Sequence, residues 1–181
     1  MAKDKSQRNL ALVVVDVQRK FFFVPHPSAE ASRDMHLEGV ATLVDMFHEA
    51  GRPVFFVVHD GPARGTCSGE EGMELLDGIP AGPDDIFVHK THMNAFNGTD
   101  LAEMIRELGC DTALICGMYA EHCAMATYWG AWDNGLSPFM AKGGMIAFRE
   151  EVLESVYAVC RTFDFDEVAE NLSRAADERF H

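Results

Sequence analysis

The sequence predicts an α/β protein built as a three-layer α/β/α sandwich with a mostly parallel central sheet. Short runs that are almost wholly apolar alternate with longer amphipathic segments along the 181-residue chain, and the connections are short. Strands that are apolar on both faces are typical of parallel sheets covered by helices on both sides. A chain of this length can bury a substantial core, and we expect one domain that spans residues 1–181.

The expected strands and helices follow one another in regular alternation. Apolar runs predict strands at residues 10–16, 53–59, 85–88 and 112–116, with a weaker candidate at 136–141. Amphipathic patterns predict helices at about 35–50, 99–108, 121–134 and 150–159. Gly51 and Gly109 stand just past two of these helices, where a left-handed cap is expected. The segment 61–84 is rich in Gly, Pro and acidic residues and predicts a functional loop or a subunit contact.

Charge and composition argue against several classes of function. The formal net charge of −14 disfavours nucleic-acid binding, which needs a basic surface to neutralise phosphates, and also disfavours anionic membranes. No apolar run approaches the roughly 18 residues that a membrane-spanning helix needs. The five cysteines are an odd number without disulfide-scaffold or Cys-x-x-Cys spacing, which favours a reducing cytoplasm.

Cys123 is a candidate nucleophile. It follows an apolar run that breaks at Gly117, and a helix-compatible stretch continues directly after it. A thiol at such a strand-to-helix elbow lies near free backbone N–H groups, whose positive end favours a thiolate and an oxyanion. The alternative is a buried structural cysteine, the usual state of a free cysteine in proteins.

Two further polar residues directly follow apolar runs. Asp16 ends the first expected strand, and Lys90 comes just after the third. In an open parallel sheet, polar residues at the carboxyl ends of strands point into the ligand crevice. Singly, Asp16 reads as an ordinary strand-end cap and Lys90 as a solvated loop lysine. An acid, a lysine and a thiol, each just after a core strand, together predict a catalytic site.

These residues and their neighbours resemble the isochorismatase-like family of cysteine hydrolases. The matching segments are 15–18, 90–101 and 116–123, and their order and spacing agree from about residue 8 to about residue 165. The resemblance implies an isochorismatase-like fold and a catalytic set of Asp16, Lys90 and Cys123. It also implies a cis peptide bond between Met118 and Tyr119, which aims the Tyr119 N–H at an oxyanion.

The resemblance implies hydrolysis of a small amide, carbamoyl or ureido compound through a thioester. Cys123 would attack the carbonyl carbon as a thiolate that the helix N-terminus and the Lys90 ammonium favour. Asp16 would take the thiol proton, pass it to the leaving amine and then activate water. The backbone N–H groups of Tyr119 and Cys123 would form the oxyanion hole.

Several other residues are candidates for substrate binding because they lie in the matching motifs or near the expected crevice. They are Gln18, Phe21, His59, Asn94 and Phe96. The metal-dependent nicotinamidases of the family carry an Asp-x-His pair after their second strand, whereas this chain has His59 followed by Asp60. We therefore expect no metal ion and no other cofactor, with the histidines acting as substrate contacts or ordinary polar neighbours.

Two alternatives remain open. An isochorismatase-type vinyl ether hydrolase belongs to the same family but can dispense with the cysteine, so Cys123 favours amide hydrolysis. Relatives usually carry Thr or Ser where Ala120 stands, which leaves room for a non-catalytic family member that acts as a binding module. Relatives also assemble, and Trp129 and Trp132 on one expected helix offer contact surface, so we expect a homo-oligomer, a dimer or a tetramer.

Overall fold

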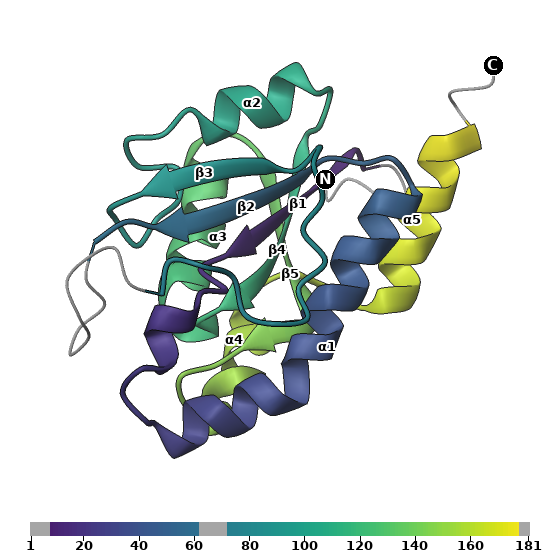
Figure 1. Ribbon diagram of the computed structural model, residues 1–181. Coiled ribbons are helices and arrows are strands. Elements are labelled where there is room, and N and C mark those ends of the chain that lie inside the picture. The colour runs from purple at the N-terminus through teal and green to yellow at the C-terminus, as the bar shows by residue number, and fades with distance from the viewer. Residues whose placement is uncertain (1–7, 62–71, 178–181) are drawn as a thin grey trace.

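The core of the molecule is one six-stranded parallel sheet, seen in a computed structural model that describes residues 8–61 and 72–177 (Figure 1). The strand order is β3-β2-β1-β4-β5-β6, and every neighbouring pair is parallel. β1 and β4 are wholly buried. The strands are β1 (Leu10–Val15), β2 (Val54–His59), β3 (Ile86–Lys90), β4 (Thr112–Met118), β5 (Ser137–Ile146) and β6 (Thr162–Phe163).

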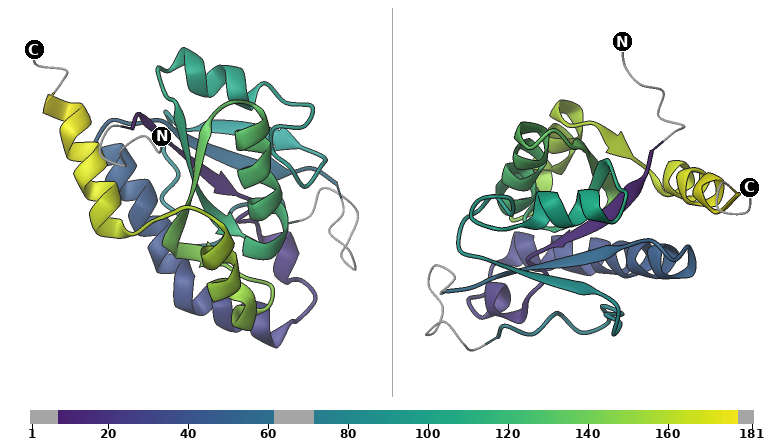
Figure 2. Two further views of the ribbon diagram at one scale, coloured as in Figure 1. Left: turned by 180° about the vertical axis from the view of Figure 1, so that it is seen from behind. Right: turned by 90° about the horizontal axis from the view of Figure 1, so that it is seen from above.

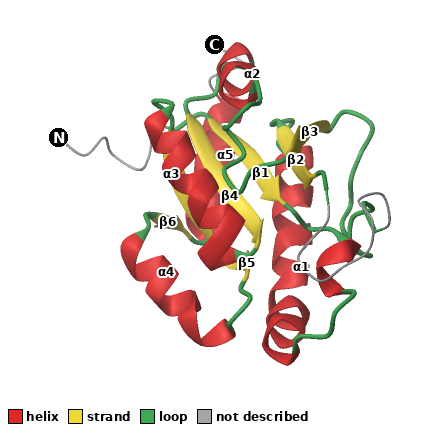
Figure 3. Ribbon diagram, turned by 90° about the vertical axis from the view of Figure 1, so that its left-hand side faces the viewer, coloured by secondary structure: helices red, strands yellow, loops and turns green. Residues whose placement is uncertain are grey.

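Helices cover both faces of the sheet and complete a three-layer sandwich, which confirms the predicted fold class. The helix pair α1 and α5 packs against one face, whereas α3 and α4 pack against the other (Figures 2 and 3). The helices are α1 (Pro27–Glu49), α2 (Leu101–Glu107), α3 (Met125–Asp133), α4 (Leu153–Val159) and α5 (Phe165–Asp177). Shorter helical turns are η1 (Arg19–Phe22), η2 (Ala120–Ala124) and η3 (Glu150–Val152).

The five predicted strands are present, and the differences from prediction have local causes. α1 begins at Pro27 rather than near residue 35, because His26 caps the backbone N–H of Ala29 and a proline suits the first helical turn. β6 has two residues and is too short to show a period. α5 was not predicted, although Val168 and Leu172 give it a buried apolar stripe opposite polar residues, the pattern of a surface helix.

The order of connections places a crevice at the carboxyl ends of the central strands. β1 lies between β2 and β4, so the chain leaves β1 in one direction and after β3 continues on the other side. Such a topological switch point is where open α/β sheets bind ligands. At this edge Gly117 of β4 faces Val15 of β1, where a Cβ would come 2.4 Å from the Val15 carbonyl oxygen. Gly117 also has a φ of 98°, so only glycine suits this position.

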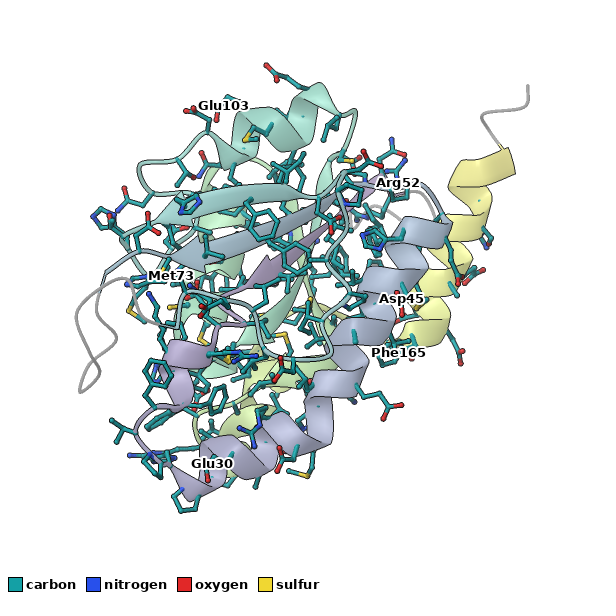
Figure 4. The ribbon with its side chains drawn as sticks, viewed as in Figure 1. Glu30, Asp45, Arg52, Met73, Glu103 and Phe165 are labelled. Carbon is teal, nitrogen blue, oxygen red and sulfur yellow. The ribbon has the colours of Figure 1, made fainter. Side chains whose placement is uncertain are left out.

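The described part of the segment predicted as a loop packs beside the end of β1. The backbone N–H of Arg19 donates to the carbonyl of Glu74 at 3.0 Å, and that of Leu76 donates to Val17 at 2.9 Å. Gln18 forms an isolated antiparallel bridge with Leu75. Met73 lies between the end of β2 and the turn η1 (Figure 4). Residues 62–71 of the predicted loop lie outside the described residues.

Candidate active site

The structure brings Asp16, Lys90 and Cys123 together at the carboxyl edge of the sheet. The ammonium Nζ of Lys90 lies 2.7 Å from Asp16 Oδ2, and these side chains are 0% and 2% exposed. The Cys123 side chain is half-buried and lies close enough to both partners for each of them to shift the pKa of its thiol. Each residue comes from the end of a different strand: β1, β3 and the elbow after β4.

Backbone geometry at the end of β1 sets the position of Asp16. Its φ is 53°, and among the described residues Asp16 is the only one other than glycine that has a left-handed φ. Aspartate tolerates this conformation better than most residues, although such positions carry strain and concentrate at functional sites. Its N–H donates to the Val57 carbonyl at 2.9 Å. Oδ1 is buried and makes no hydrogen bond to any described residue, so it is the oxygen available to accept the thiol proton.

The ammonium group of Lys90 is fully used by oxygen and nitrogen acceptors. Its three contacts are Asp16 Oδ2 at 2.7 Å, the His92 carbonyl at 3.0 Å and His59 Nδ1 at 3.1 Å. These match the three N–H bonds that a lysine ammonium can donate. Lys90 therefore fixes the Asp16 carboxylate and the His59 ring, while Cys123 lies at its side.

The elbow after β4 presents Cys123 through an irregular turn rather than a regular helix start. The Met118–Tyr119 peptide bond is cis, the form that the resemblance implies. η2 is a π-helical turn with non-helical angles at His122, and α3 begins only at Met125. π-helical turns are frequent at functional sites. The helix predicted from residue 121 is therefore interrupted at the position of the thiol.

Burial shifts the pKa of the Cys123 thiol in the direction opposite to that expected from the helix N-terminus and Lys90. Desolvation raises the pKa of Cys123 to about 12, and the neighbouring Asp16 carboxylate adds to the rise while Lys90 opposes it. Burial likewise raises the pKa of Asp16, again against the effect of Lys90. In the free protein these effects favour the protonated thiol over the thiolate that the sequence features were expected to favour.

Among the predicted substrate contacts, Gln18 and His59 form one unit. The His59 N–H donates to Gln18 Oε1 at 2.8 Å, and Gln18 Nε2 donates to the carbonyls of Met73 at 3.2 Å and His59 at 3.5 Å. Gln18 is fully buried, whereas His59 is half-buried. The amide of Gln18 is therefore used to hold backbone at the end of β2.

Phe21 belongs to an aromatic wall beside the triad. Its ring centroid lies 6.1 Å from that of Tyr119 and 6.3 Å from that of His59. The Tyr119 hydroxyl donates to the Phe21 carbonyl at 3.1 Å, and Phe148 packs edge-on against Tyr119 at 5.3 Å. These half-buried rings flank the elbow that carries Cys123 and form an apolar surface next to the reacting groups.

Asn94 and Phe96 are directed toward α3 and the core. Asn94 Oδ1 accepts from the Phe96 N–H at 2.9 Å, and a Cβ on Gly130 of α3 would come 2.0 Å from the same oxygen. The Ala95 N–H donates to Thr127 Oγ1 at 3.1 Å, and Phe96 is 7% exposed. These contacts fix the loop after β3 on α3, and no hydrogen bond within the described residues joins Asn94 to the triad.

Two residues near the site escaped sequence reasoning. Lys20 is 1% exposed, and its ammonium contacts the carbonyls of His59 and Gly61, although it stands in a short polar run that suggests a solvated lysine. Glu121 accepts from the backbone N–H groups of Phe148 at 3.1 Å and Arg149 at 2.8 Å, which ties the elbow to the end of β5. Both roles depend on long-range contacts that leave no local pattern.

The described residues do not form the donor set of a metal site. They include no group of three or more His, Cys, Asp or Glu side chains able to hold a metal ion. His59 Nδ1 faces the Lys90 ammonium at 3.1 Å, and Asp60 Oδ1 faces His89 Nδ1 at 2.9 Å. A ring nitrogen that accepts from an ammonium has no lone pair left for a metal.

The cavity detected in the described part of the chain lies away from Asp16, Lys90 and Cys123. A half-open cavity of about 860 Å³ lies at the opposite, amino-terminal edge of the strands, where Arg52 and His48 line it (Figure 4 shows Arg52). Asp85 there accepts from the Gly82 N–H at 2.6 Å and contacts His48 at 2.7 Å. The cavity holds none of the triad residues.

Within the described ranges, no helix combines the length and apolar character needed to cross a membrane.

Comparisons with known proteins agree with this arrangement. The model of the isochorismatase domain matches residues 10–155. Nicotinamidase 3 of Arabidopsis thaliana is 27% identical over 169 residues, which cover 84% of this chain and 81% of that protein.

Solved structures share the fold. A cysteine hydrolase of Pseudomonas syringae pv. phaseolicola superposes with a TM-score of 0.79 at 18% identity, covering 97% of this chain and all of the other. N-carbamoylsarcosine amidase of Thermoplasma acidophilum gives 0.71 at 21% identity, covering 86% and 95%. The family model spans most of the sequence and includes all three triad residues. The chain therefore belongs to the isochorismatase family.

Proposed function

We propose that the protein is a cysteine-dependent hydrolase that cleaves the C–N bond of a small amide, carbamoyl or ureido compound through a thioester. The observation that carries this proposal is a half-buried thiol near a buried carboxylate, where each group affects the pKa of the other and Lys90 holds one carboxylate oxygen at 2.7 Å. Two relatives named for amide hydrolysis, a nicotinamidase and an N-carbamoylsarcosine amidase, support the reaction class.

Acylation begins with proton transfer within the triad. The Cys123 thiol gives its proton to Asp16 as Sγ bonds to the amide carbonyl carbon, and the carbonyl oxygen becomes an oxyanion. The pKa of Asp16 is raised by burial, which makes its carboxylate a stronger base than an exposed aspartate. As the C–N bond breaks, Asp16 returns the proton to the leaving nitrogen, and ammonia or an amine departs from the thioester.

Deacylation reverses the roles. Asp16 takes a proton from a water molecule, whose oxygen attacks the thioester carbonyl carbon. The C–S bond breaks, the acid product leaves, and the Cys123 sulfur regains the proton. Lys90 stays bound to Asp16 Oδ2 throughout and keeps the carboxylate in place, so it acts as a holder of the base rather than as a proton donor.

The oxyanion is assigned to the backbone of the elbow. The N–H of Tyr119 precedes the turn η2 and the N–H of Cys123 lies within it, and the Tyr119 carbonyl already accepts from His122 at 2.9 Å and Ala124 at 3.2 Å. These bonds fix the backbone around the thiol before substrate arrives. A fixed N–H donor at an oxyanion typically contributes ~3 kcal/mol to transition-state stabilisation.

The missing hydroxyl at position 120 is compatible with activity. Ala120 is fully buried within the hydrophobic core, so a hydroxyl there would brace the elbow instead of facing the crevice. The elbow is braced in another way, because Glu121 binds two backbone N–H groups of the loop after β5. This arrangement favours an active enzyme over a non-catalytic binding module.

An ammonia-release screen over small amides tests the proposal, with the Cys123→Ala protein as the blank. We expect at least one carboxamide, carbamoyl or ureido compound to release ammonia with wild type only. Hydrolysis of isochorismate with equal rates in wild type and Cys123→Ala would instead support the vinyl ether reaction. Ammonia release that persists in Cys123→Ala contradicts the role given to the cysteine.

Assembly and compartment belong to the same proposal. Trp129 and Trp132 on α3 are 47% and 55% exposed, which supports a homo-oligomer that buries them. The four described cysteines, Cys110, Cys116, Cys123 and Cys160, are free thiols, which supports a reducing cytoplasm, while Cys67 lies outside the described residues.

A further inference from the structure

We propose that His59 is a specificity-determining residue whose Nε2–H, held in one tautomer by Lys90, donates a hydrogen bond to an acceptor atom on the substrate away from the scissile amide. The proposal rests on the proposed function for the identity of the site. The ligand class it names is a small amide that carries a second hydrogen-bond acceptor, such as a ring nitrogen or a carbonyl oxygen.

The contact with Lys90 fixes which ring nitrogen carries the proton. Lys90 Nζ lies 3.1 Å from His59 Nδ1, and an ammonium group has no lone pair with which to accept. Nδ1 must therefore be the acceptor, and in a neutral imidazole the proton is then on Nε2. The tautomer follows from the same ammonium that holds Asp16, so the binding and catalytic groups share one anchor.

Two buried side chains hold the backbone of His59. Gln18, which is 0% exposed, accepts from the His59 N–H at 2.8 Å and donates to its carbonyl at 3.5 Å. Lys20, which is 1% exposed, contacts the same carbonyl and donates to the Gly61 carbonyl at 2.8 Å. Phe21 packs against the ring at a centroid distance of 6.3 Å. Backbone and ring are thus both fixed before a ligand binds.

The charges around the ring keep it neutral. Burial, as the largest cause, together with Lys90, Lys20 and His92 lowers the pKa of His59 to about 4, while Asp60 opposes them. These groups come from β3, from η1 and from the loops after β2 and β3. Neutral His59 presents one N–H donor across the range in which enzymes work, rather than a pH-dependent charge.

The second ring nitrogen is open to a ligand. Within the described residues, no protein acceptor contacts His59 Nε2, and this atom is not among the buried polar atoms that lack a partner. Nδ1 and Nε2 lie on opposite sides of the ring, so Nε2–H points away from the Lys90 ammonium. The acceptor that the proposal assigns to Nε2–H lies on a substituent of the substrate.

The tautomer is measurable without activity. In ¹⁵N-detected spectra of the whole protein, assigned by comparison with His59→Gln, we expect His59 Nε2 protonated and Nδ1 unprotonated from about pH 5.5 to 9. Lys90→Met should release this constraint and raise the pKa of the ring, because the cation is removed. A proton on Nδ1, or a ring that titrates near pH 6.5 in wild type, overturns the proposal.

Recognition is measured on Cys123→Ala protein, which binds without turnover. Nicotinamide and benzamide differ by one ring nitrogen in place of a C–H, and we expect nicotinamide to bind about fivefold to tenfold more tightly. Adding His59→Leu should abolish the difference, while His59→Gln, which keeps a donor, should retain part of it. His48→Gln, at the opposite edge of the sheet, is the control that should leave the ratio unchanged.

Three results contradict the recognition role of His59. They are equal binding of nicotinamide and benzamide, binding of neither, and an affinity ratio that stays unchanged in His59→Leu. The failure of the proposed function has a different signature, because it would appear as ammonia release that survives Cys123→Ala. The binding and tautomer measurements need no turnover, so the two outcomes are separate.

Discussion

At the scale of single residues, the proposed mechanism depends on proton transfer inside a buried cluster. The Cys123 thiol and the Asp16 carboxylate both have raised pKa values because burial penalises their charged forms. One charged carboxylate held by Lys90 is tolerated, whereas a second negative charge on the sulfur beside it is disfavoured. The thiolate is therefore expected only when the proton has moved to Asp16 during attack on a substrate.

This arrangement makes a prediction for alkylation by iodoacetamide. With a pKa of about 12 in the free protein, the labelling rate of Cys123 should rise about tenfold per pH unit from pH 7 to 9 without a plateau. Asp16→Asn should lower the pKa because the negative neighbour is removed, and Lys90→Met should raise it. Peptide mapping against the pH of labelling measures each change.

Ammonia release by the same variants is the control for the labelling experiment. Asp16→Asn should label faster at neutral pH and yet lose most ammonia release, since the base is gone. A wild-type Cys123 that labels at its full rate near pH 7 would refute the buried-thiol state.

The buried ion pair makes a second prediction, for stability. Lys90→Met leaves the Asp16 carboxylate buried without its cation and should cost about 3–5 kcal/mol in the free energy of unfolding. The double variant Lys90→Met with Asp16→Asn removes both charges and should recover most of that loss. Urea unfolding of the wild type, both single variants and the double variant measures the coupling. Additive losses would show that the two side chains do not interact.

At the scale of elements, the elbow between β4 and α3 depends on one glycine. Gly117→Ala should destabilise the protein by more than ~2 kcal/mol, because a Cβ would meet the Val15 backbone at 2.4 Å and φ is 98°. Gly109 also has a left-handed φ, 72°, but a Cβ there meets nothing within 4 Å. Gly109→Ala should therefore cost only about 1 kcal/mol.

Chemical denaturation of both glycine variants decides the point. Equal losses would mean that backbone conformation alone, and not the close approach of β1 and β4, requires glycine at position 117. We also expect Gly117→Ala to reduce ammonia release more than Gly109→Ala does, because only the first displaces the turn that carries Cys123.

Sequence patterns predicted the elements whose burial is recorded locally. β1 and β4 are wholly apolar or nearly so, and β3 begins with a short apolar run, so their ends located Asp16, Lys90 and Cys123 at one edge of a parallel sheet. Properties that depend on distant segments were beyond reach. The burial of Lys20 depends on residues 72–76 packing beside the end of β1, and the sign of the Cys123 pKa shift depends on desolvation by the folded core.

At the scale of the whole molecule, the exposed tryptophans of α3 predict assembly. We expect sedimentation at micromolar concentration to show a dimer or tetramer of the 20.1 kDa chain. Trp129→Lys should weaken it, because a lysine disfavours a buried interface. Met35→Lys on α1, an apolar position that is 57% exposed, is the control and should leave assembly unchanged. A single ~20 kDa species for wild type would contradict assembly.

The central claim is that Cys123, with Asp16 as its base, forms a thioester with the acyl part of an amide. Rapid acid quench of wild type during turnover of an amide from the screen, followed by mass mapping of peptides, tests it most directly. We expect the acyl mass on the peptide that contains Cys123, its accumulation to be abolished in Cys123→Ala and slowed in Asp16→Asn. Turnover without any acyl adduct on Cys123, or with the adduct on another residue, would contradict the mechanism.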